Sequence, residues 1–411
     1  GLSTISTTAR TQHNRTAMHY SQMLYDKAVD SLTGFAQASR EWRHDISYQY
    51  HRYKFFDQRP PSDSSLYGVA TVNPRGIRSL IRHQLLENTV SVRQALGGTL
   101  TSAPLWVKIY LRHQWHGVYQ EPIRFNENNF TIGALVQNNP QFRLKYRLNG
   151  QATWAAQRLD FYVRGRLGYD LKILGYLEAE TNFQRYQAGL VDRQLYASWD
   201  LVWDNTVAFR QIQVFNFGGS YTYRLKTRPV GILVKGTLLN HTLTNWVYYD
   251  AEDRRAIQAP TSINLLQLQA KANLRFGTVH LDNEVIWQPI LVGGAYFRVP
   301  ELILQHNLYW EDWLFKRAMR AKIGLHFYYH TDYFPYGYTP LTGSFFVQNQ
   351  TPLSIYPRLD AYVSFRIWQF RFFVRGENLG YFVYERNYNT AFQHPITNFV
   401  VRIGIAWRLF E

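Results

Sequence analysis

The 411-residue sequence contains no cysteine, few charged residues and no long apolar run. Without cysteine, the chain has no disulfide, no thiolate metal site and no cysteine nucleophile. Charged residues make up 18% of the chain, below the roughly one quarter of an average soluble protein. No stretch reaches the roughly 18 apolar residues that a transmembrane helix needs.

Aromatic residues are abundant, with 12 Trp, 30 Tyr and 26 Phe. Disordered chains are poor in such residues, so this composition excludes disorder. The net charge of +16 favours anionic partners, namely nucleic acid, anionic lipid or anionic solutes, and composition alone does not choose among them. The chain begins with Gly1 and Leu2, which is typical of a processed or truncated protein.

The dominant pattern in the sequence is an alternation of apolar and polar residues. Leu359 and Ala361 alternate with Asp360 and Tyr362, and similar segments recur along the whole chain. Such a pattern indicates strands with one apolar and one wet face. About 16 strands, within a range of about 14 to 18, are predicted near residues 40–56, 75–96, 103–119, 127–137, 141–152, 156–166, 169–183, 206–224, 229–250, 261–276, 278–291, 300–312, 314–331, 356–368, 370–384 and 396–411.

The connections between these segments alternate in length. Short turns are predicted at residues 138–140, 226–229 and 276–277, whereas residues 57–74, 251–260, 331–355 and 385–395 form long loops. Short turns at one end and long loops at the other are typical of outer-membrane barrels. No composition shift marks a domain boundary, so we expect one barrel over residues 39–411, preceded by an N-terminal arm or plug at residues 1–38.

A soluble sandwich also alternates, but two features favour an all-β, closed antiparallel transmembrane β-barrel. Large apolar residues occupy one face along whole strands, as in residues 314–331, and a barrel in lipid needs such a band. Tryptophans gather near strand ends, where they would form interfacial girdles rather than fill a sandwich core.

The polar faces carry many more basic than acidic residues. If these faces line a lumen, the wall is positive and favours anions. The alternative is a narrow lumen filled by long side chains that carboxylates neutralise. The predicted pore-lining residues are Lys108, Arg112, Arg143, Lys145, Arg147, Lys316, Arg320, Lys322, Arg371 and Arg375.

Several segments resemble the putative porin family of Bacteroidota outer membranes. They are residues 299–310 (VPELILQHNLYW), 333–340 (YFPYGYTP), 356–361 (YPRLDA) and 402–411 (RIGIAWRLFE). The resemblance covers residues 200–411 well, 75–200 loosely and the first 74 residues weakly. It implies an outer-membrane barrel whose closing strand, residues 396–411, is recognised by the barrel-assembly machinery.

The sequence offers no catalytic, cofactor-binding or metal-binding motif. There is no His-Glu-x-x-His zinc pattern, Gly-x-Ser-x-Gly elbow, P-loop or dinucleotide-binding glycine pattern. We therefore expect neither an enzyme nor a cofactor. Basic and aromatic residues lie on opposite faces of the strands, so we do not expect nucleic-acid binding.

The predicted function is passive diffusion of small hydrophilic, preferably anionic, solutes across the outer membrane. The alternative is a plugged barrel that serves as scaffold or accessory subunit of a larger outer-membrane complex, with other outer-membrane proteins as partners. In that case Arg15 to Ala36, a stretch that could be helical, would fill the lumen or bind the partner.

Overall fold

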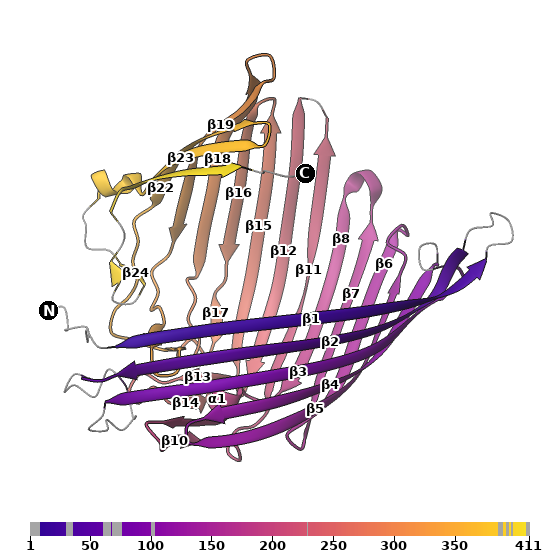
Figure 1. Ribbon diagram of the computed structural model, residues 1–411. Helices are drawn as coiled ribbons and strands as arrows, with labels where there is room; N and C mark the ends of the chain where they lie inside the picture. The colour runs from indigo at the N-terminus through magenta and orange to yellow at the C-terminus, as the bar shows by residue number, and fades with distance from the viewer. Residues whose placement is uncertain are drawn as a thin grey trace.

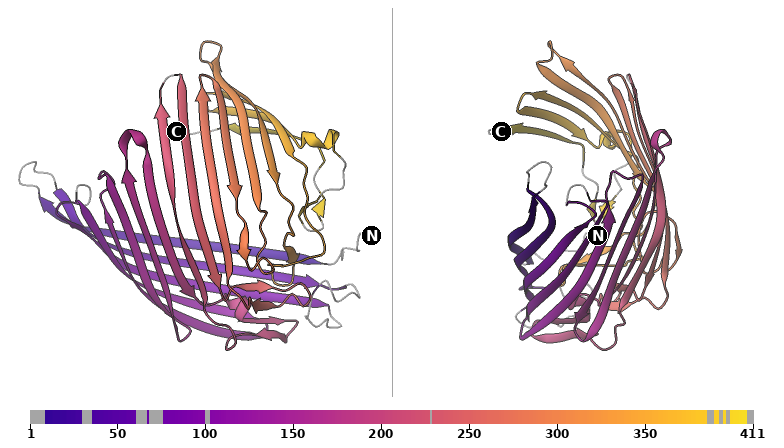
Figure 2. Two further views of the ribbon diagram at one scale, coloured as in Figure 1. Left: turned by 180° about the vertical axis from the view of Figure 1, so that it is seen from behind. Right: turned by 90° about the vertical axis from the view of Figure 1, so that its right-hand side faces the viewer.

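The computed structural model is an all-β protein dominated by one large, coiled antiparallel sheet (Figures 1 and 2). The structure describes residues 9–29, 36–60, 67, 76–99, 103–227, 229–384, 389–391, 394–395 and 398–407. The sheet contains 18 strands, at the upper end of the expected range. The strands of this sheet are β1 Arg10–Val29, β2 Ala36–Asp57, β3 Ile77–Leu96, β4 Leu105–Gln120, β5 Ile123–Asn138, β6 Leu144–Ala155, β7 Arg158–Asp170, β8 Tyr176–Tyr186, β11 Ile212–Lys226, β12 Val230–Thr244, β15 Ile263–Phe276, β16 Val279–Trp287, β17 Ile290–Val292, β18 Leu302–Leu314, β19 Met319–His330, β22 Arg358–Ile367, β23 Phe370–Glu377 and β26 Val400–Trp407.

Each long strand pairs antiparallel with the next long strand along the chain, from β1 to β26. Every one of the predicted segments overlaps one of these strands. The tight turns have the backbone that two-residue hairpins need: Ala156 and Gln157 between β6 and β7 both have positive φ, 42° and 64°.

The short strands were not predicted and raise the total well above 16. They lie in three small sheets within the long connections. Their bounds are β9 Gln194–Ala197 with β10 Asp200–Asp204; β13 Val247–Tyr249, β14 Ala256–Gln258, β20 Gly337–Thr339 and β21 Ser344–Phe346; and β24 Asn389–Ala391 with β25 His394–Pro395. Alternation could not reveal them, because segments of two to five residues are too short to show a period.

The N-terminal segment differs from the helical expectation. Arg10–Val29 forms β1, which pairs with β2 along its whole length. The stretch from Arg15 to Val29, which was expected to be possibly helical, is therefore part of a strand of the large sheet. Residues 30–35, the rest of that segment, lie outside the described residues.

The two edges of the sheet are β1 and β26. Among the described residues, β1 pairs only with β2 and β26 only with β23, and the figures show the two edges apart. Because neighbouring long strands alternate in direction, β1 and β26 run in the same direction. The sheet is thus open between these two strands in the structure.

Helices are few and short: α1 Leu190–Arg193 and the 3₁₀ turns η2 Lys172–Leu174 and η3 Leu379–Phe382. In the part of the chain that the structure describes, no helix has the length and apolarity to span a membrane.

Candidate functional site

The pairing register places the polar residues of neighbouring strands on one common face. Tyr110, Gly133 and Gln151 lie directly opposite one another on β4, β5 and β6. The Tyr110 hydroxyl donates to Gln151 Oε1 at 2.8 Å across Gly133. A Cβ on Gly133 would lie 2.1 Å from the Tyr110 ring, so this contact requires glycine. We call this polar side of the sheet the inner face, since connecting loops pack against it.

The opposite, outer face is apolar and exposed. Leu111 on β4 and Ile132 on β5 lie opposite each other and are 60% and 58% exposed, and Ile403 on β26 is 67% exposed. Exposed aliphatic side chains in rows across paired strands are what a lipid-facing surface requires. Alternate residues of each strand therefore lie on a polar face suited to water and on an apolar face suited to lipid.

Eight of the ten predicted pore-lining residues lie in strands of the large sheet and on its inner face. These are Lys108, Arg112, Lys145, Arg147, Arg320, Lys322, Arg371 and Arg375. The strand positions expected for Arg143 and Lys316 are wrong, because Arg143 precedes β6 in a bend and Lys316 lies in the turn between β18 and β19. Three successive residues of that turn, Phe315 to Arg317, have positive φ, which ends the alternation.

Carboxylates on neighbouring strands neutralise some of these cations. Arg112 lies 3.9 Å from Glu87 on β3, and Arg320 lies 2.6 Å from Glu311 on β18. Arg375 bonds to Asp360 at 2.5 Å. Only the register between strands identifies such partners, and a single sequence does not give that register.

Other wall cations have no such partner. Within the described residues, no carboxylate lies within 4.0 Å of Lys145, Arg147 or Arg371. Lys145 Nζ lies 5.1 Å from the Tyr176 ring, and Arg147 lies directly opposite Arg166 on β7. The inner face thus keeps an excess of positive charge on β6, β7 and β23.

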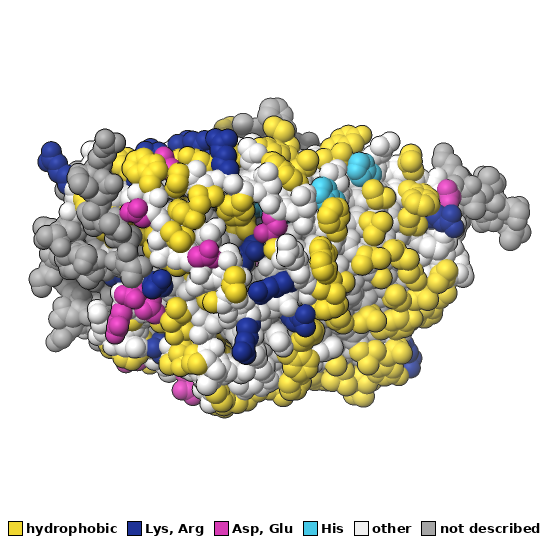
Figure 3. Space-filling model, turned by 90° about the horizontal axis from the view of Figure 1, so that it is seen from below, with side chains coloured by type: hydrophobic (Ala, Val, Ile, Leu, Met, Phe, Trp, Pro, Cys, Tyr) yellow, Lys and Arg dark blue, Asp and Glu magenta, His cyan; other side chains and the backbone are white. Residues whose placement is uncertain are grey.

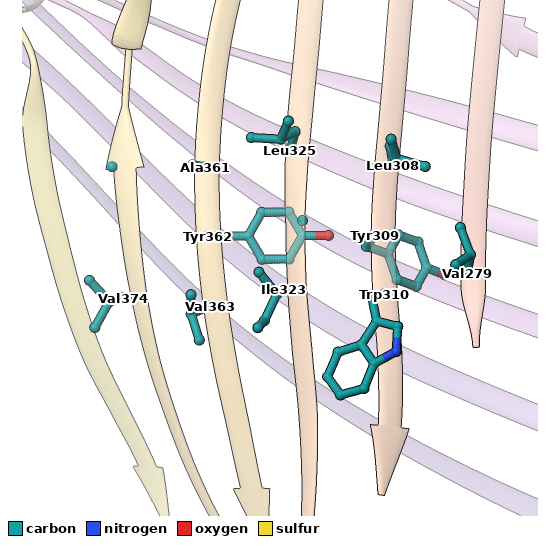
Figure 4. Close-up of a pocket in the computed structure, with 12 residues that line it drawn as sticks. Val279, Leu308, Tyr309, Trp310, Ile323, Leu325, Ala361, Tyr362, Val363 and Val374 are labelled. Atoms are coloured by element: carbon teal, nitrogen blue, oxygen red, sulfur yellow. The ribbon is translucent and has the colours of Figure 1, made fainter. Parts of the chain in front are cut away.

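Lys322 is held by aromatic rings near the middle of β19. Its Nζ lies 3.6 Å from the Tyr309 ring centroid, which suits a cation–π contact, and 5.7 Å from that of Tyr362. Figure 4 shows Tyr362 reaching across β19 toward Tyr309. Gly324 makes room for both rings, since a Cβ there would lie 2.6 Å from Tyr309 and 2.7 Å from Tyr362.

The hollow around Gly324 has a volume of about 490 Å³. Apart from the two tyrosines and Trp310, aliphatic side chains and glycines line it, and Leu308 and Ile323 among them are half-exposed on the outer face. Its chemistry is that of the lipid-facing side.

Three long connections, residues 187–211, 245–262 and 331–357, pack together at one end of the sheet, and we call them the loop layer. Their buried core contains Leu195, Trp203, Tyr249 and Phe346. Tyr249 on β13 bridges to Phe346 on β21, which joins two connections into one small sheet. Seen from below, packed side chains cover this end, with Lys and Arg near its middle (Figure 3).

The loop layer is attached to the inner face of distant strands. Arg193 Nη2 lies 2.8 Å from Glu127 on β5, with both side chains 15% exposed. Gln120 of β4 donates to the Gln194 carbonyl at 3.0 Å. The Tyr53 hydroxyl of β2 donates to the Pro340 carbonyl, so the connection that leaves β19 reaches the opposite side of the sheet.

One acidic group of the loop layer, Asp192, is half-buried. Burial raises the pKa of Asp192 above its usual value, although the Tyr249 hydroxyl donates to its Oδ1 at 2.7 Å. The sequence predicted the long loop at residues 331–355 but neither the connection at residues 187–211 nor the packing of these connections into one layer.

The described residues hold no group of three His, Asp or Glu side chains placed to bind a metal ion. The arrangement offers instead a basic wet face, an apolar outer face and a packed layer across one end. These are features of a passage through a membrane.

Comparison with known proteins agrees with this class. The family model described as "Putative porin" matches residues 11–411, so the chain belongs to that family and is an outer-membrane protein. No curated protein matches the chain.

Solved outer-membrane proteins share the fold at low sequence identity. The copper transporter OprC is 9% identical with a TM-score of 0.66, over 97% of this chain and 65% of that one. The FrpB iron transporter of Neisseria meningitidis is 9% identical with a TM-score of 0.61, over 97% and 69%. A mutant ferric enterobactin receptor of Pseudomonas aeruginosa is 11% identical with a TM-score of 0.58, over 84% and 57%. The chain thus spans roughly 57 to 69% of the length of these structures.

Proposed function

We propose that this chain is a porin that lets small hydrophilic, preferably anionic, solutes diffuse passively across the outer membrane, in Bacteroidota as the sequence resemblance suggests. The observation that carries the proposal is the uncompensated positive charge of the inner face. Four cations of β6 and β7 lie on the inner face: Lys145, Arg147, Arg164 and Arg166. Within the described residues, Glu180 is the one carboxylate within 4.0 Å of any of them, and it lies 3.2 Å from Arg164 and 3.2 Å from Arg166. Fixed cations in a confined aqueous path concentrate anions.

We also propose that the sheet closes into a barrel in the membrane. In hydrocarbon every backbone donor and acceptor needs a partner, so the edges at β1 and β26 cannot remain exposed to lipid. The exposed apolar residues on both edge strands, Met18 at 66% and Ile405 at 66%, support a membrane location for each. The barrel-assembly machinery would recognise residues 396–411, a segment that includes β26.

Single-channel recording in a planar bilayer under a salt gradient tests the proposed transport. The wild type should show discrete steps and an anion-selective reversal potential. Replacing Lys145 and Arg147 together by Glu should lower the anion-to-cation permeability ratio by at least about fivefold, since one charge a few ångströms from the ion path contributes about 1 kcal/mol or more.

The matched control is the double variant Arg143→Glu and Lys316→Glu. It makes the same change in charge at two turn residues, and its permeability ratio should stay near that of the wild type. Cation selectivity of the wild type would contradict the proposal.

The loop layer favours a second candidate function, that of a plugged scaffold or accessory subunit in a larger outer-membrane complex. The layer crosses one end of the sheet and joins strands on opposite sides of it. Correctly folded protein that gives no conductance steps would support this function instead.

A further inference from the structure

A row of three arginines crosses the inner face at the short-turn end of the sheet. Arg320 on β19 lies directly opposite Arg366 on β22, which lies directly opposite Arg371 on β23. Like charges directly opposite each other destabilise a sheet unless a counter-charge lies between them. The row therefore needs more negative charge than its surroundings provide.

The carboxylates of the described residues supply only part of that charge. Glu311 lies 2.6 Å from Arg320. Arg366 donates from its Nε to the Trp368 carbonyl at 3.3 Å, and among the described residues its terminal nitrogens have no hydrogen-bond acceptor. Within the described part of the chain, no carboxylate lies within 4.0 Å of Arg366 or Arg371.

A cavity of about 370 Å³ lies at this row. Its lining consists of Trp313, Arg317, Ala318, Arg320, Arg366 and Trp368. The volume is in the range of small-molecule sites. The lining places three guanidinium groups, those of Arg317, Arg320 and Arg366, around one space, and each can donate charge-assisted hydrogen bonds to a bound anion.

We propose that this cavity binds a phosphate group. The guanidinium group is planar and presents paired donors that match two phosphate oxygens. Phosphate is therefore a better ligand here than chloride, which is a single atom and cannot offer two separate acceptors to one guanidinium. The inference deepens the proposed function and rests on it, because a phosphate held at this end serves uptake only if the barrel conducts. The phosphate belongs either to a solute or to a lipid headgroup.

Binding is measured on the full chain in detergent by isothermal titration with inorganic phosphate at constant ionic strength. The double variant Arg317→Gln and Arg366→Gln, which changes two arginines of the cavity lining, should bind phosphate at least tenfold more weakly than the wild type. Arg210→Gln with Arg255→Gln removes the same charge from exposed loop residues, whose hydrogen bonds to other described residues use only their backbone groups. This control should bind like the wild type.

Phosphorus analysis of the purified proteins separates the two sources. If a lipid headgroup occupies the cavity, the wild type retains bound lipid that the double variant loses, and inorganic phosphate binds only after delipidation. If the source is a solute, the wild type binds inorganic phosphate without delipidation. Equal phosphate binding and equal lipid content in the wild type and the double variant would overturn the inference.

A second variant guards against misfolding. Arg317→Lys with Arg366→Lys keeps the charge but loses the paired donors, so it should bind phosphate with reduced affinity while its gel mobility stays heat-modifiable. The titration does not depend on conductance. A barrel that binds phosphate but does not conduct would contradict the proposed function and leave the site intact, whereas a conducting barrel without phosphate binding would contradict only the site.

Discussion

Asp360 on β22 is a carboxylate with no exposed surface in a wall that is otherwise wet. It accepts hydrogen bonds from Arg358 Nε at 3.1 Å, Arg375 Nη2 at 2.5 Å and the Asn378 backbone at 2.8 Å. Glu377 extends this network to Arg402 on β26 at 2.9 Å. The network therefore ties together the last three strands of the sheet.

Replacing Asp360 by Asn should destabilise this edge of the sheet. The change leaves Arg358 and Arg375 with too little negative charge, and breaking a buried ion pair costs about 3–5 kcal/mol. The measurement is the temperature at which the folded gel mobility is lost. Asp332→Asn, at an exposed residue just after β19, is the control and should leave that temperature unchanged.

The loop layer should become less stable as pH rises, through Asp192. Its pKa is raised by burial, so between the usual value of 3.8 and the raised pKa the folded layer binds more protons than the unfolded layer. The contribution of Asp192 to the stability of the folded layer is fully present at low pH and is lost as pH rises through the raised pKa.

Hydrogen exchange of residues 187–211 measures this effect. The protection of the wild type relative to Asp192→Asn should fall with rising pH, since the variant does not titrate and the ratio cancels the intrinsic dependence of exchange on pH. A ratio that is constant across the acidic range would show that Asp192 does not control the layer.

At the scale of elements, we expect the β20–β21 hairpin to limit the passage if the barrel conducts as proposed. Pro340 in this hairpin accepts the Tyr53 hydrogen bond from the far wall, and Phe346 belongs to the core of the loop layer. Replacing residues 337–346 by a short Gly-Ser linker should increase single-channel conductance. Unchanged conductance in a heat-modifiable variant would place the constriction elsewhere.

The elements that the sequence predicted are the long strands, in which the polarity of each residue indicates the face of the sheet on which its side chain lies. Alternation is local, so the long strands and their two faces follow from it. The loop layer is different, because Leu195, Trp203 and Phe209 meet partners such as Phe346 that are more than a hundred residues away along the chain. The pairing of Arg320 with Glu311 could not be predicted for a different reason: it depends on the register of β18 and β19, which alternation does not determine.

At the scale of the whole molecule, closure is the decisive question, and the lack of cysteine makes it testable. Because β1 and β26 run in the same direction, a direct seam between them would be parallel, while the long strands elsewhere pair antiparallel. Cysteines placed one at a time at Ala17, His19, Ser21 or Met23, on the inner face of β1, would each be combined with Ala406→Cys on β26. A disulfide forms only when the two Cα atoms lie within about 7 Å.

A closed barrel predicts that one or two of these combinations form a cross-link within a single chain. Met18→Cys, on the outer face of β1, should not cross-link to Ala406→Cys, because the side chains of neighbouring β1 residues point to opposite sides. Cross-links between two chains would mean instead that a second copy covers the edges. That result would contradict the closed single-chain barrel and place any pore in an assembly.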